Sequence, residues 1–283
     1  MNFLETFFNG LSQGGIYALI ALGYTMVYGI AKMLNFAHGD LIMVGAYSIV
    51  VTVGVAVHPI FAILIAIIFC VILGIVVERF AYRPLRQASP LAVLITAIGV
   101  SYLLQNLFLI IFGSAPKMIS WLDNFNSTTV TIVTLVSAVV IMVLLTLFIK
   151  LTNTGKAMVA VSQDRSASQL MGININSTIV ITFAIGSALA AVAGAFYLMK
   201  SPLATYTMGS MPGIKAFTAA VIGGIGSIPG AMLGGFLLGL IEEFCNSIPG
   251  LSNFTIAIEF GILILILLVK PTGFLGKKLK EKV

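Results

Sequence analysis

The sequence predicts an all-α integral membrane protein: a polytopic helical bundle of about eight to nine membrane segments, with broken or re-entrant elements. Hydrophobic residues make up 59% of the 283 residues and charged residues only 8%, whereas about a quarter of a soluble domain is charged. The mean hydropathy is +1.12. The apolar residues form continuous runs, unlike the alternating strands of a membrane β-barrel.

Nine apolar runs are candidate membrane segments, because a helix needs about 20 apolar residues to cross about 30 Å of hydrocarbon. The runs fall at about 7–31, 38–57, 60–77, 90–112, 130–149, 178–199, 209–226, 229–245 and 253–269. Backbone groups in lipid must be hydrogen-bonded internally, so each run should be helical. Together they predict one transmembrane domain over residues 1–283, without a separate soluble domain.

The run at 209–226 differs from the others because it contains Pro212, Lys215 and several glycines. Proline interrupts a helix and a buried charge is costly in lipid. We therefore expect a broken or re-entrant element here, shielded by protein or lining a cavity.

Basic residues predict the orientation, because lysine and arginine concentrate in cytoplasmic loops. They cluster after the third, fifth and last runs: Arg79, Arg83 and Arg86; Lys150, Lys156 and Arg165; and Lys270, Lys277, Lys278, Lys280 and Lys282. If 209–226 is a full crossing, these three regions lie in the cytoplasm. The N-terminus and the loop around 117–129, with Trp121 and Asp123, then lie outside.

The net charge of +6 does not indicate nucleic-acid binding, because the basic residues flank the apolar runs. Cys70 and Cys245 lie within apolar runs, so we interpret them as packed thiols. The histidines His38 and His58 stand apart and no acidic cluster accompanies them, so no metal site is predicted. Phosphate-loop, HExxH and GxSxG motifs are missing from the sequence. We therefore expect a chain that is not an enzyme by itself.

A polar loop over about 150–177 separates two apolar halves. Within 155–172, the apolar residues Ala157, Ala160, Val161 and Met171 recur at roughly helical spacing, and polar residues fill the opposite positions. Gly172 would then end this helix as a C-terminal cap. A solvated surface helix is one interpretation; the other is a helix that docks in a groove of a cytoplasmic partner.

Two further segments could line a pathway. The first is Asn35-Phe-Ala-His38-Gly39-Asp40, whose polar groups either cap a helix or mark a broken helix end near the pathway. The second is glycine-rich, with Gly223, Gly224 and Gly226 followed by Pro229. Most of the chain's glycines indicate tight helix packing, but here a hinge or unwound segment is favoured.

Single polar residues inside the apolar runs allow two interpretations. Glu259 lies within the last run, where a carboxylate is costly and suggests either function or a hydrogen bond to another helix. We find no mid-membrane base to pair with it, which argues against an ion-coupled carrier. Gln105 and Asn106 are expected to form interhelical hydrogen bonds.

In order and spacing, several segments resemble the LivH-type inner-membrane permeases of ABC importers for branched-chain amino acids. The matching stretches, which cover nearly the whole chain, are LNFAHGD (34–40) with GAY (45–47), ERFAYRPLR (78–86), TGKA (154–157) with DRSA (164–167) and LMGI (170–173), and GGIGSIPGA (223–231) with Gly234-Gly235. Closely similar permeases carry urea or short amides, which leaves a permease of that type as an alternative, and fold does not determine substrate.

The resemblance implies a multi-pass protein of the bacterial inner membrane. The implied partners are a second, related permease, two cytoplasmic ATPases that bind ATP and Mg²⁺, and an extracytoplasmic binding protein. It also implies that the polar loop docks on an ATPase through Gln163, Asp164, Arg165, Ala167 and Gly172. The expected pathway residues are Asn35, His38, Gly39, Asp40, Gly223, Gly224 and Gly226. Rival interpretations are an ion-coupled carrier, a passive channel for a small solute such as urea, and a purely structural membrane subunit.

Overall fold

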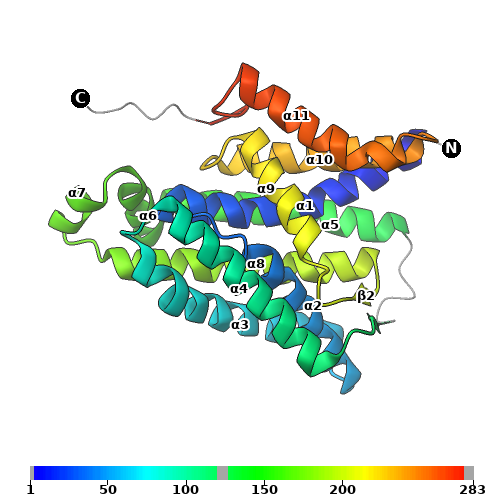
Figure 1. Ribbon diagram of the computed structural model, residues 1–283, viewed down its shortest axis with the longest axis horizontal. Coiled ribbons are helices and arrows are strands. Elements are labelled where there is room, and N and C mark those ends of the chain that lie inside the picture. Colours follow the sequence, from blue (N-terminus) through cyan, green and yellow to red (C-terminus); the bar gives the residue numbers. More distant parts are fainter. Residues whose placement is uncertain (1–2, 120–126, 277–283) are drawn as a thin grey trace.

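The computed structural model describes residues 3–119 and 127–276, and within them it is almost entirely helical (Figure 1). The long elements are α1 (Phe3–Ala31), α2 (His38–Gly54), α3 (Pro59–Val77), α4 (Pro90–Phe112), α5 (Ser127–Leu151), α8 (Ile175–Lys200), α9 (Ser210–Gly223), α10 (Ile228–Ser247) and α11 (Thr255–Val269). The short ones are η1 (Glu78–Tyr82), η2 (Arg83–Leu85), β1 (Lys117–Met118), α6 (Asn153–Gln163), α7 (Arg165–Leu170), β2 (Leu203–Ala204) and η3 (Ser252–Phe254). The predicted Lys277, Lys278, Lys280, Lys282, Trp121 and Asp123 lie outside the described residues.

All nine predicted apolar runs are helical, which confirms the all-α membrane class. In the described part of the chain, seven helical stretches are long and apolar enough to cross a membrane. The helices α2 and α9 are shorter, at 17 and 14 residues. The predicted number of eight to nine spans therefore depends on how these two helices are placed in the membrane.

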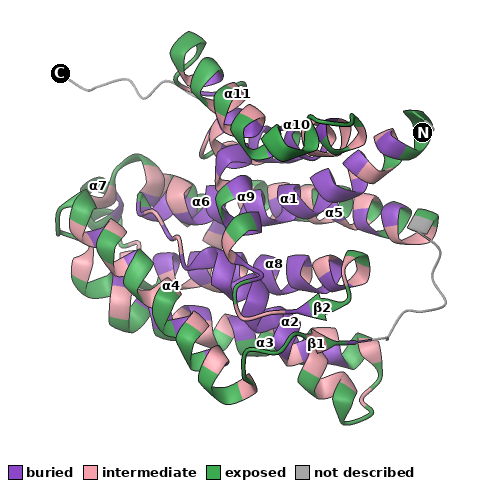
Figure 2. Cartoon of the chain, turned by 45° about the vertical axis from the view of Figure 1, so that its right-hand side comes forward, coloured by how far each residue is buried: buried purple, intermediate pink, exposed green. Residues whose placement is uncertain are grey.

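The bundle is built around α1, which is buried along most of its length (Figure 2). It contacts α10, α8, α5 and α9, and α8 in turn packs on α2 and α3. By contrast, α3, α4, α5 and α11 present isoleucine, leucine and valine on exposed outer faces. A helix with such a face is suited to contact lipid. The buried interior and the lipid-facing shell are thus both apolar.

Helix starts follow local capping chemistry. Side chains of Ser89, Asn174 and Ser227 each accept a hydrogen bond from a backbone amide in the first turn, at 3.3, 3.1 and 3.2 Å. Proline follows at or next to the first helical position in α4 and α10, where its missing amide costs nothing. These signals fix where α4, α8 and α10 begin.

The two short helices begin inside the bundle. A side chain on Gly23 would overlap the imidazole of His38, so α2 begins beside α1 about 12 Å before α1 ends, at about 1.5 Å per residue. The connecting segment 32–37 therefore turns back into the bundle. Gly209, just before α9, lies against the backbone of Gly39, so α9 begins at a similar depth.

The two ends of the bundle differ. The strands β1 and β2 pair at one end, with Lys117 opposite Ala204; we call this the strand end. At the other end, Arg86 hydrogen-bonds Asn176 and Arg165 hydrogen-bonds Ala31. We call this the basic end; α6 and α7 project from it (Figure 1).

Glycine allows three helices to meet at backbone distance. Side chains on Gly239 or Gly235 would overlap α1 at Gly14 or Ala18, and one on Gly234 would overlap Ala219 of α9. Small residues at such positions let membrane helices pack closely. The predicted packing role of these glycines is confirmed.

We predict that Gly239→Ala destabilises the bundle, because the added methyl group overlaps the Gly14 backbone and overpacking costs about 1–3 kcal/mol. The midpoint of thermal unfolding in detergent should fall by several degrees. Gly261→Ala is the control, since nothing lies within 4 Å of its added Cβ. An equal midpoint for the two variants would contradict the packing argument.

Candidate functional site

The polar loop forms a helical hairpin of two short helices. The single helix predicted over 155–172 is wrong, because the backbone turns at Asp164, with φ −156° and ψ 112°. The Asp164 carboxylate accepts a hydrogen bond from the Ala167 amide at 2.9 Å and caps α7. Aspartate is a favoured N-cap residue, which explains the break.

The predicted C-terminal cap at Gly172 is confirmed. Gly172 has φ +80°, its amide donates to the Gln169 carbonyl at 3.0 Å, and the Ile173 amide donates to the Ser168 carbonyl at 3.0 Å. This pair of bonds defines a Schellman motif, which favours glycine at its left-handed position.

The hairpin buries some predicted residues and exposes others. Val161 is buried as predicted, together with Met158, which was not predicted. Met171 was assigned to the apolar face, but it is 82% exposed and its neighbour Leu170 is 89% exposed. Gln163 is also exposed. The C-terminal end of α7 therefore presents two apolar side chains at the basic end.

Arg165 points back toward the bundle. It is half-buried and its guanidinium donates a hydrogen bond to the Ala31 carbonyl at the end of α1. The next residue, Lys32, has a left-handed backbone with φ +53°. Arg165 thus connects the hairpin to the segment that precedes α2.

The polar groups of the 35–40 segment bind other helices. The capping interpretation is wrong, because Ala37 precedes α2 without a side-chain cap bond. The Asn35 side chain accepts a hydrogen bond from the Tyr82 hydroxyl at 2.7 Å. The Asp40 carboxylate accepts one from Gln105 at 2.9 Å. Both Asn35 and Asp40 are almost fully buried.

Gln105 forms interhelical hydrogen bonds as predicted, since its amide also lies 3.1 Å from the Ser210 hydroxyl. Asn106 does not, because it donates to the Tyr102 carbonyl of its own helix and is exposed. Adjacent residues of an α-helix point about 100° apart, so Gln105 faces the neighbouring helices while Asn106 is exposed.

The glycine-rich segment forms the turn between α9 and α10. Gly224 and Gly226 have φ +105° and +91°, and Gly223 ends α9. The amides of Phe274 and Leu275 donate to the carbonyls of Ile222 and Gly223, both at 2.9 Å. The segment after α11 therefore covers the end of α9. A side chain on Gly224 would overlap this segment at Gly276, whereas one on Gly223 would overlap Gly230 near the start of α10.

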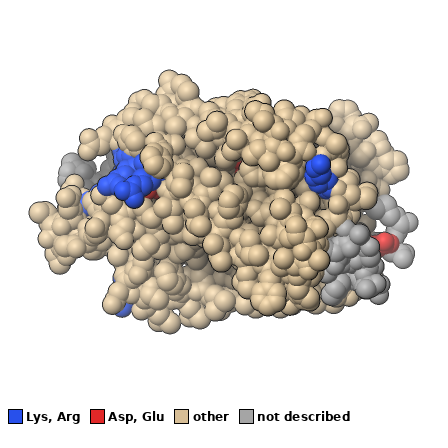
Figure 3. Space-filling model, turned by 90° about the horizontal axis from the view of Figure 1, so that it is seen from below, with Lys and Arg blue, Asp and Glu red and all other residues tan. Residues whose placement is uncertain are grey.

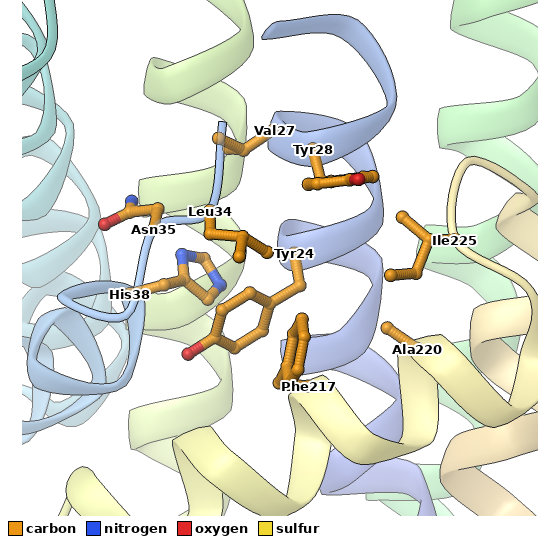
Figure 4. A pocket seen from close by; sticks show the side chains of 9 residues that line it. All are labelled: Tyr24, Val27, Tyr28, Leu34, Asn35, His38, Phe217, Ala220 and Ile225. Carbon is orange, nitrogen blue, oxygen red and sulfur yellow. The ribbon is translucent and has the colours of Figure 1, made fainter. Parts of the chain in front are cut away.

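A small cavity brings both predicted pathway segments together (Figure 4). Its walls are formed by Tyr24, Val27, Tyr28, Leu34, Asn35, His38, Phe217, Ala220 and Ile225. Asn35 and His38 come from the first segment, and Ile225 lies between Gly224 and Gly226. The other predicted residues, Gly39, Asp40, Gly223, Gly224 and Gly226, are not among its walls.

The cavity holds about 10 Å³, which is room for roughly one water molecule. The rings of Tyr24 and His38 lie 4.7 Å apart, centroid to centroid. Among the described residues, neither the Tyr24 hydroxyl nor either His38 nitrogen makes a hydrogen bond of good geometry, although the backbones of Gly39 and Ile20 lie nearby. Buried polar groups normally have partners, and one water molecule in this cavity would supply one.

A buried ion cluster lies between α9, α10 and α11. The Lys215 ammonium is 2.7 Å from Glu242 and 3.2 Å from Glu259. Tyr17 of α1 donates a hydrogen bond to Glu242 at 2.6 Å. The prediction that Glu259 has no basic partner is therefore wrong. Lys215 was interpreted only as a disturbance of its own run, and the sequence does not show that α9 and α11 are neighbours.

The described residues contain no group of three or more histidine, cysteine, aspartate or glutamate side chains that could hold a metal ion. Cys70 and Cys245 are buried free thiols, as predicted.

The chain matches a family model described as "Branched-chain amino acid transport system / permease component" over residues 6–268. The chain belongs to this family. It is 43% identical to the high-affinity branched-chain amino acid transport system permease protein BraD of Pseudomonas aeruginosa, covering 100% of this chain and 98% of BraD. It is 42% identical to LivH of Escherichia coli K12, covering 99% and 98%. No solved structure matches the chain significantly.

A more distant relative is the probable branched-chain amino acid transport permease protein LivH of Methanocaldococcus jannaschii, at 27% identity over 94% of this chain and 91% of the relative. Family membership and the long apolar helices together identify a multi-pass protein of the bacterial inner membrane. The resemblance in the sequence motifs is confirmed.

We predict that Lys215→Met strongly destabilises the permease, because it leaves Glu242 and Glu259 without a counter-charge. Removing one partner of a buried ion pair costs about 3–5 kcal/mol. The thermal unfolding midpoint in detergent should fall well below that of Lys150→Met, which removes an exposed lysine.

The double variant Lys215→Met with Glu259→Met should recover part of this loss, because it removes an orphaned carboxyl as well. If the double variant were no more stable than Lys215→Met alone, Lys215 and Glu259 would not be energetically coupled.

Proposed function

We propose that this chain is the transmembrane permease subunit of an ATP-driven importer for branched-chain amino acids. The observation that carries the proposal is the match of the whole chain to permeases of that transport system at 42–43% identity. No contact among the described residues supports the alternative of a permease for urea or short amides.

The sequence has no nucleotide-binding motif, so in this proposal ATP is hydrolysed by other subunits. The partners in the proposal are a second, homologous permease, two cytoplasmic ATPases and an extracytoplasmic binding protein. ATP and Mg²⁺ are held by the ATPases, and this chain is not catalytic. It forms one transmembrane domain over residues 1–283.

The hairpin of α6 and α7 is the contact with an ATPase. The exposed Gln163, Asp164 and Ala167 lie along it, and Gly172 sets the turn at its end. Leu170 and Met171, exposed at the C-terminal end of α7, add an apolar surface that fits a hydrophobic groove of the ATPase. Arg165 belongs to the same coupling element, but it transmits movement of the hairpin to Ala31 instead of contacting the ATPase directly.

The pathway runs past the cavity between Tyr24, His38 and Phe217. At about 10 Å³ this cavity excludes an amino acid, so the described conformation is closed here. Asn35 and the Gly223–Gly226 turn can move apart if α1 and α9 separate. ATP-driven closure of the ATPases pulls the hairpin, and the bundle then opens to the other side.

The proposed topology has nine crossings. Seven are continuous helices, and two combine an irregular segment with a short helix: 32–37 with α2, and 205–209 with α9. Such discontinuous helices are tolerated in membranes when protein shields their free backbone groups. The N-terminus is then outside, and the basic end faces the cytoplasm.

An ion-coupled carrier remains a competing mechanism, and the Lys215–Glu259 pair removes the argument that no charge partner exists. The decisive measurement is leucine uptake by the complete complex in liposomes. Uptake that requires internal ATP and survives an ionophore supports the importer. Uptake that does not depend on ATP and is abolished by the ionophore would contradict the importer. So would leucine flux into liposomes that contain this chain alone.

We predict that Leu170→Ser combined with Met171→Ser uncouples transport. Both side chains are more than four-fifths exposed, so fold stability should change little, whereas loss of two apolar contacts should weaken ATPase docking by about 1.5–3 kcal/mol per side chain at most. ATP-dependent leucine uptake should fall at least tenfold, and less ATPase should co-purify.

The matched controls are Gly172→Asn and Gly172→Arg. Asparagine tolerates the left-handed conformation that Gly172 adopts, so uptake should be largely retained; arginine strains the turn and should reduce uptake. Normal uptake by both the Leu170/Met171 variant and Gly172→Arg would refute the docking assignment.

We also predict the side on which the hairpin lies. A cysteine introduced by Gln163→Cys should be inert to a membrane-impermeant thiol reagent in intact cells, but it should react in inside-out vesicles. Labelling from the outside of intact cells would show that the hairpin lies outside and would contradict the proposed mechanism.

A further inference from the structure

A second cavity lies on the outer part of the bundle at the strand end, where none of the predicted residues are found. It holds about 270 Å³ and is lined by Gln13, Tyr197, Lys200, Ser201, Glu242 and Glu243; we call it the outer groove. This volume is close to the lower limit of about 300 Å³ for small-molecule pockets. It is far larger than the closed cavity beside His38.

The outer groove presents charges of both signs at fixed positions. The Lys200 ammonium is 2.8 Å from the Glu243 carboxylate and 2.8 Å from the Gln13 side-chain oxygen. Glu242, one residue before Glu243, accepts a hydrogen bond from Tyr17 and forms an ion pair with Lys215. The groove therefore has one cationic wall from α8 and one anionic wall from α10, with Gln13 of α1 between them.

The charges do not balance within this part of the structure. Lys200 and Lys215 face three carboxylates, those of Glu242, Glu243 and Glu259. The carboxylates thus outnumber the lysines by one when all these groups are ionised. This excess attracts an ammonium group, while Lys200 offers a partner to a carboxylate, and such electrostatic attraction is stronger at partly buried sites than in water.

The outer groove lies within the span of the helices that form it. Gln13 is almost fully buried, and Glu243 lies about 6 Å before the end of α10 at about 1.5 Å per residue. Charged residues at membrane depth face protein or a water-filled path. Since β2 follows Lys200 directly, the groove opens at the end that the proposed topology places outside.

We propose that the outer groove is a binding site for the zwitterionic head group of an α-amino acid on its way into the membrane. In the described structure Lys200 and Glu243 bind each other at 2.8 Å. The amino acid replaces this ion pair: Lys200 binds its α-carboxylate, and Glu243 with Glu242 binds its α-ammonium. The walls contact the part that all α-amino acids share, so the groove selects the substrate class and not the side chain. The inference rests on the proposed transport of amino acids and adds the place where they enter.

The test measures occupancy directly. Ser201→Cys places a thiol in the groove, and the complete complex in nanodiscs, without ATP, is treated with a hydrophilic thiol reagent. L-leucine should slow labelling in a saturable manner. L-leucinamide, which lacks the carboxylate, and 4-methyl-2-oxopentanoate, which lacks the ammonium, should not. The unmodified chain is the blank, because Cys70 and Cys245 are buried.

Adding Lys200→Met should raise the leucine concentration for half-protection about ten- to a hundredfold, as expected for losing a hydrogen bond between charged groups. Lys117→Met removes a lysine at the same end of the bundle, outside the groove, and should leave protection unchanged. Glu243→Gln, which preserves the shape of the side chain, should weaken protection to a similar extent as Lys200→Met.

The double variant Lys200→Met with Glu243→Met separates binding from structure. It removes both charges of the ion pair together and leaves neither one without its partner, so thermal stability should be retained while leucine protection is lost. Retained protection in this variant or in Lys200→Met would overturn the proposal. So would equal protection by leucinamide, or protection that needs the binding protein but no amino acid.

The proposed function and the groove can fail separately. ATP-dependent leucine uptake without protection at Ser201→Cys would contradict only the proposed binding site. Protection by leucine in a complex that shows no ATP-dependent uptake would support the binding site and contradict the importer mechanism.

Discussion

The close approach of α1 to α10 and of α9 to α10 is the contact on which the rest of the structure depends. Lipid and protein interior are equally apolar, so burial alone does not hold membrane helices together, and close packing must do so. Gly14, Gly235 and Gly239 remove the side chains that would separate α1 from α10. This contact brings Tyr17 to Glu242, and the α9–α10 contact brings Lys215 there as well.

Pairing of polar groups is the second constraint, because a polar atom without a partner is costly in an apolar bundle. Several polar groups inside this one bond to a distant helix, as with Tyr82 and Asn35 or Gln105 and Asp40, and others bond to the backbone of their own helix. Tyr24 and His38 are among the buried side chains that have no hydrogen-bond partner within the described residues. They lie at the cavity where the α1–α2 connection meets the turn after α9, where a conformational change would expose them to water.

The hairpin and this cavity are close in the structure, which gives coupling a short route. Arg165 binds the Ala31 carbonyl, and the chain then passes through Lys32 to Asn35 and His38 on the cavity wall. A displacement of α7 would thus reach the segment that borders the proposed pathway. On the opposite side, the outer groove and the ion cluster share Glu242, so a ligand in the groove changes the electrostatics around Lys215.

The sequence alone determined the membrane class, the positions of nine helical runs, the Gly172 cap and the family, because continuous apolar runs, capping residues and ordered motifs are local properties of the chain. It did not reveal the break at Asp164, the exposed Met171, the partner of Glu259 or the outer groove. Asp164 could have been identified as an N-cap by its spacing to Ala167. The others required tertiary structure, because whether Met171 is buried and whether Lys215 meets Glu259 depend on which helices are neighbours. That choice is made by backbone contacts between residues far apart in the chain, such as Gly39 with Gly209 and Gly14 with Gly239.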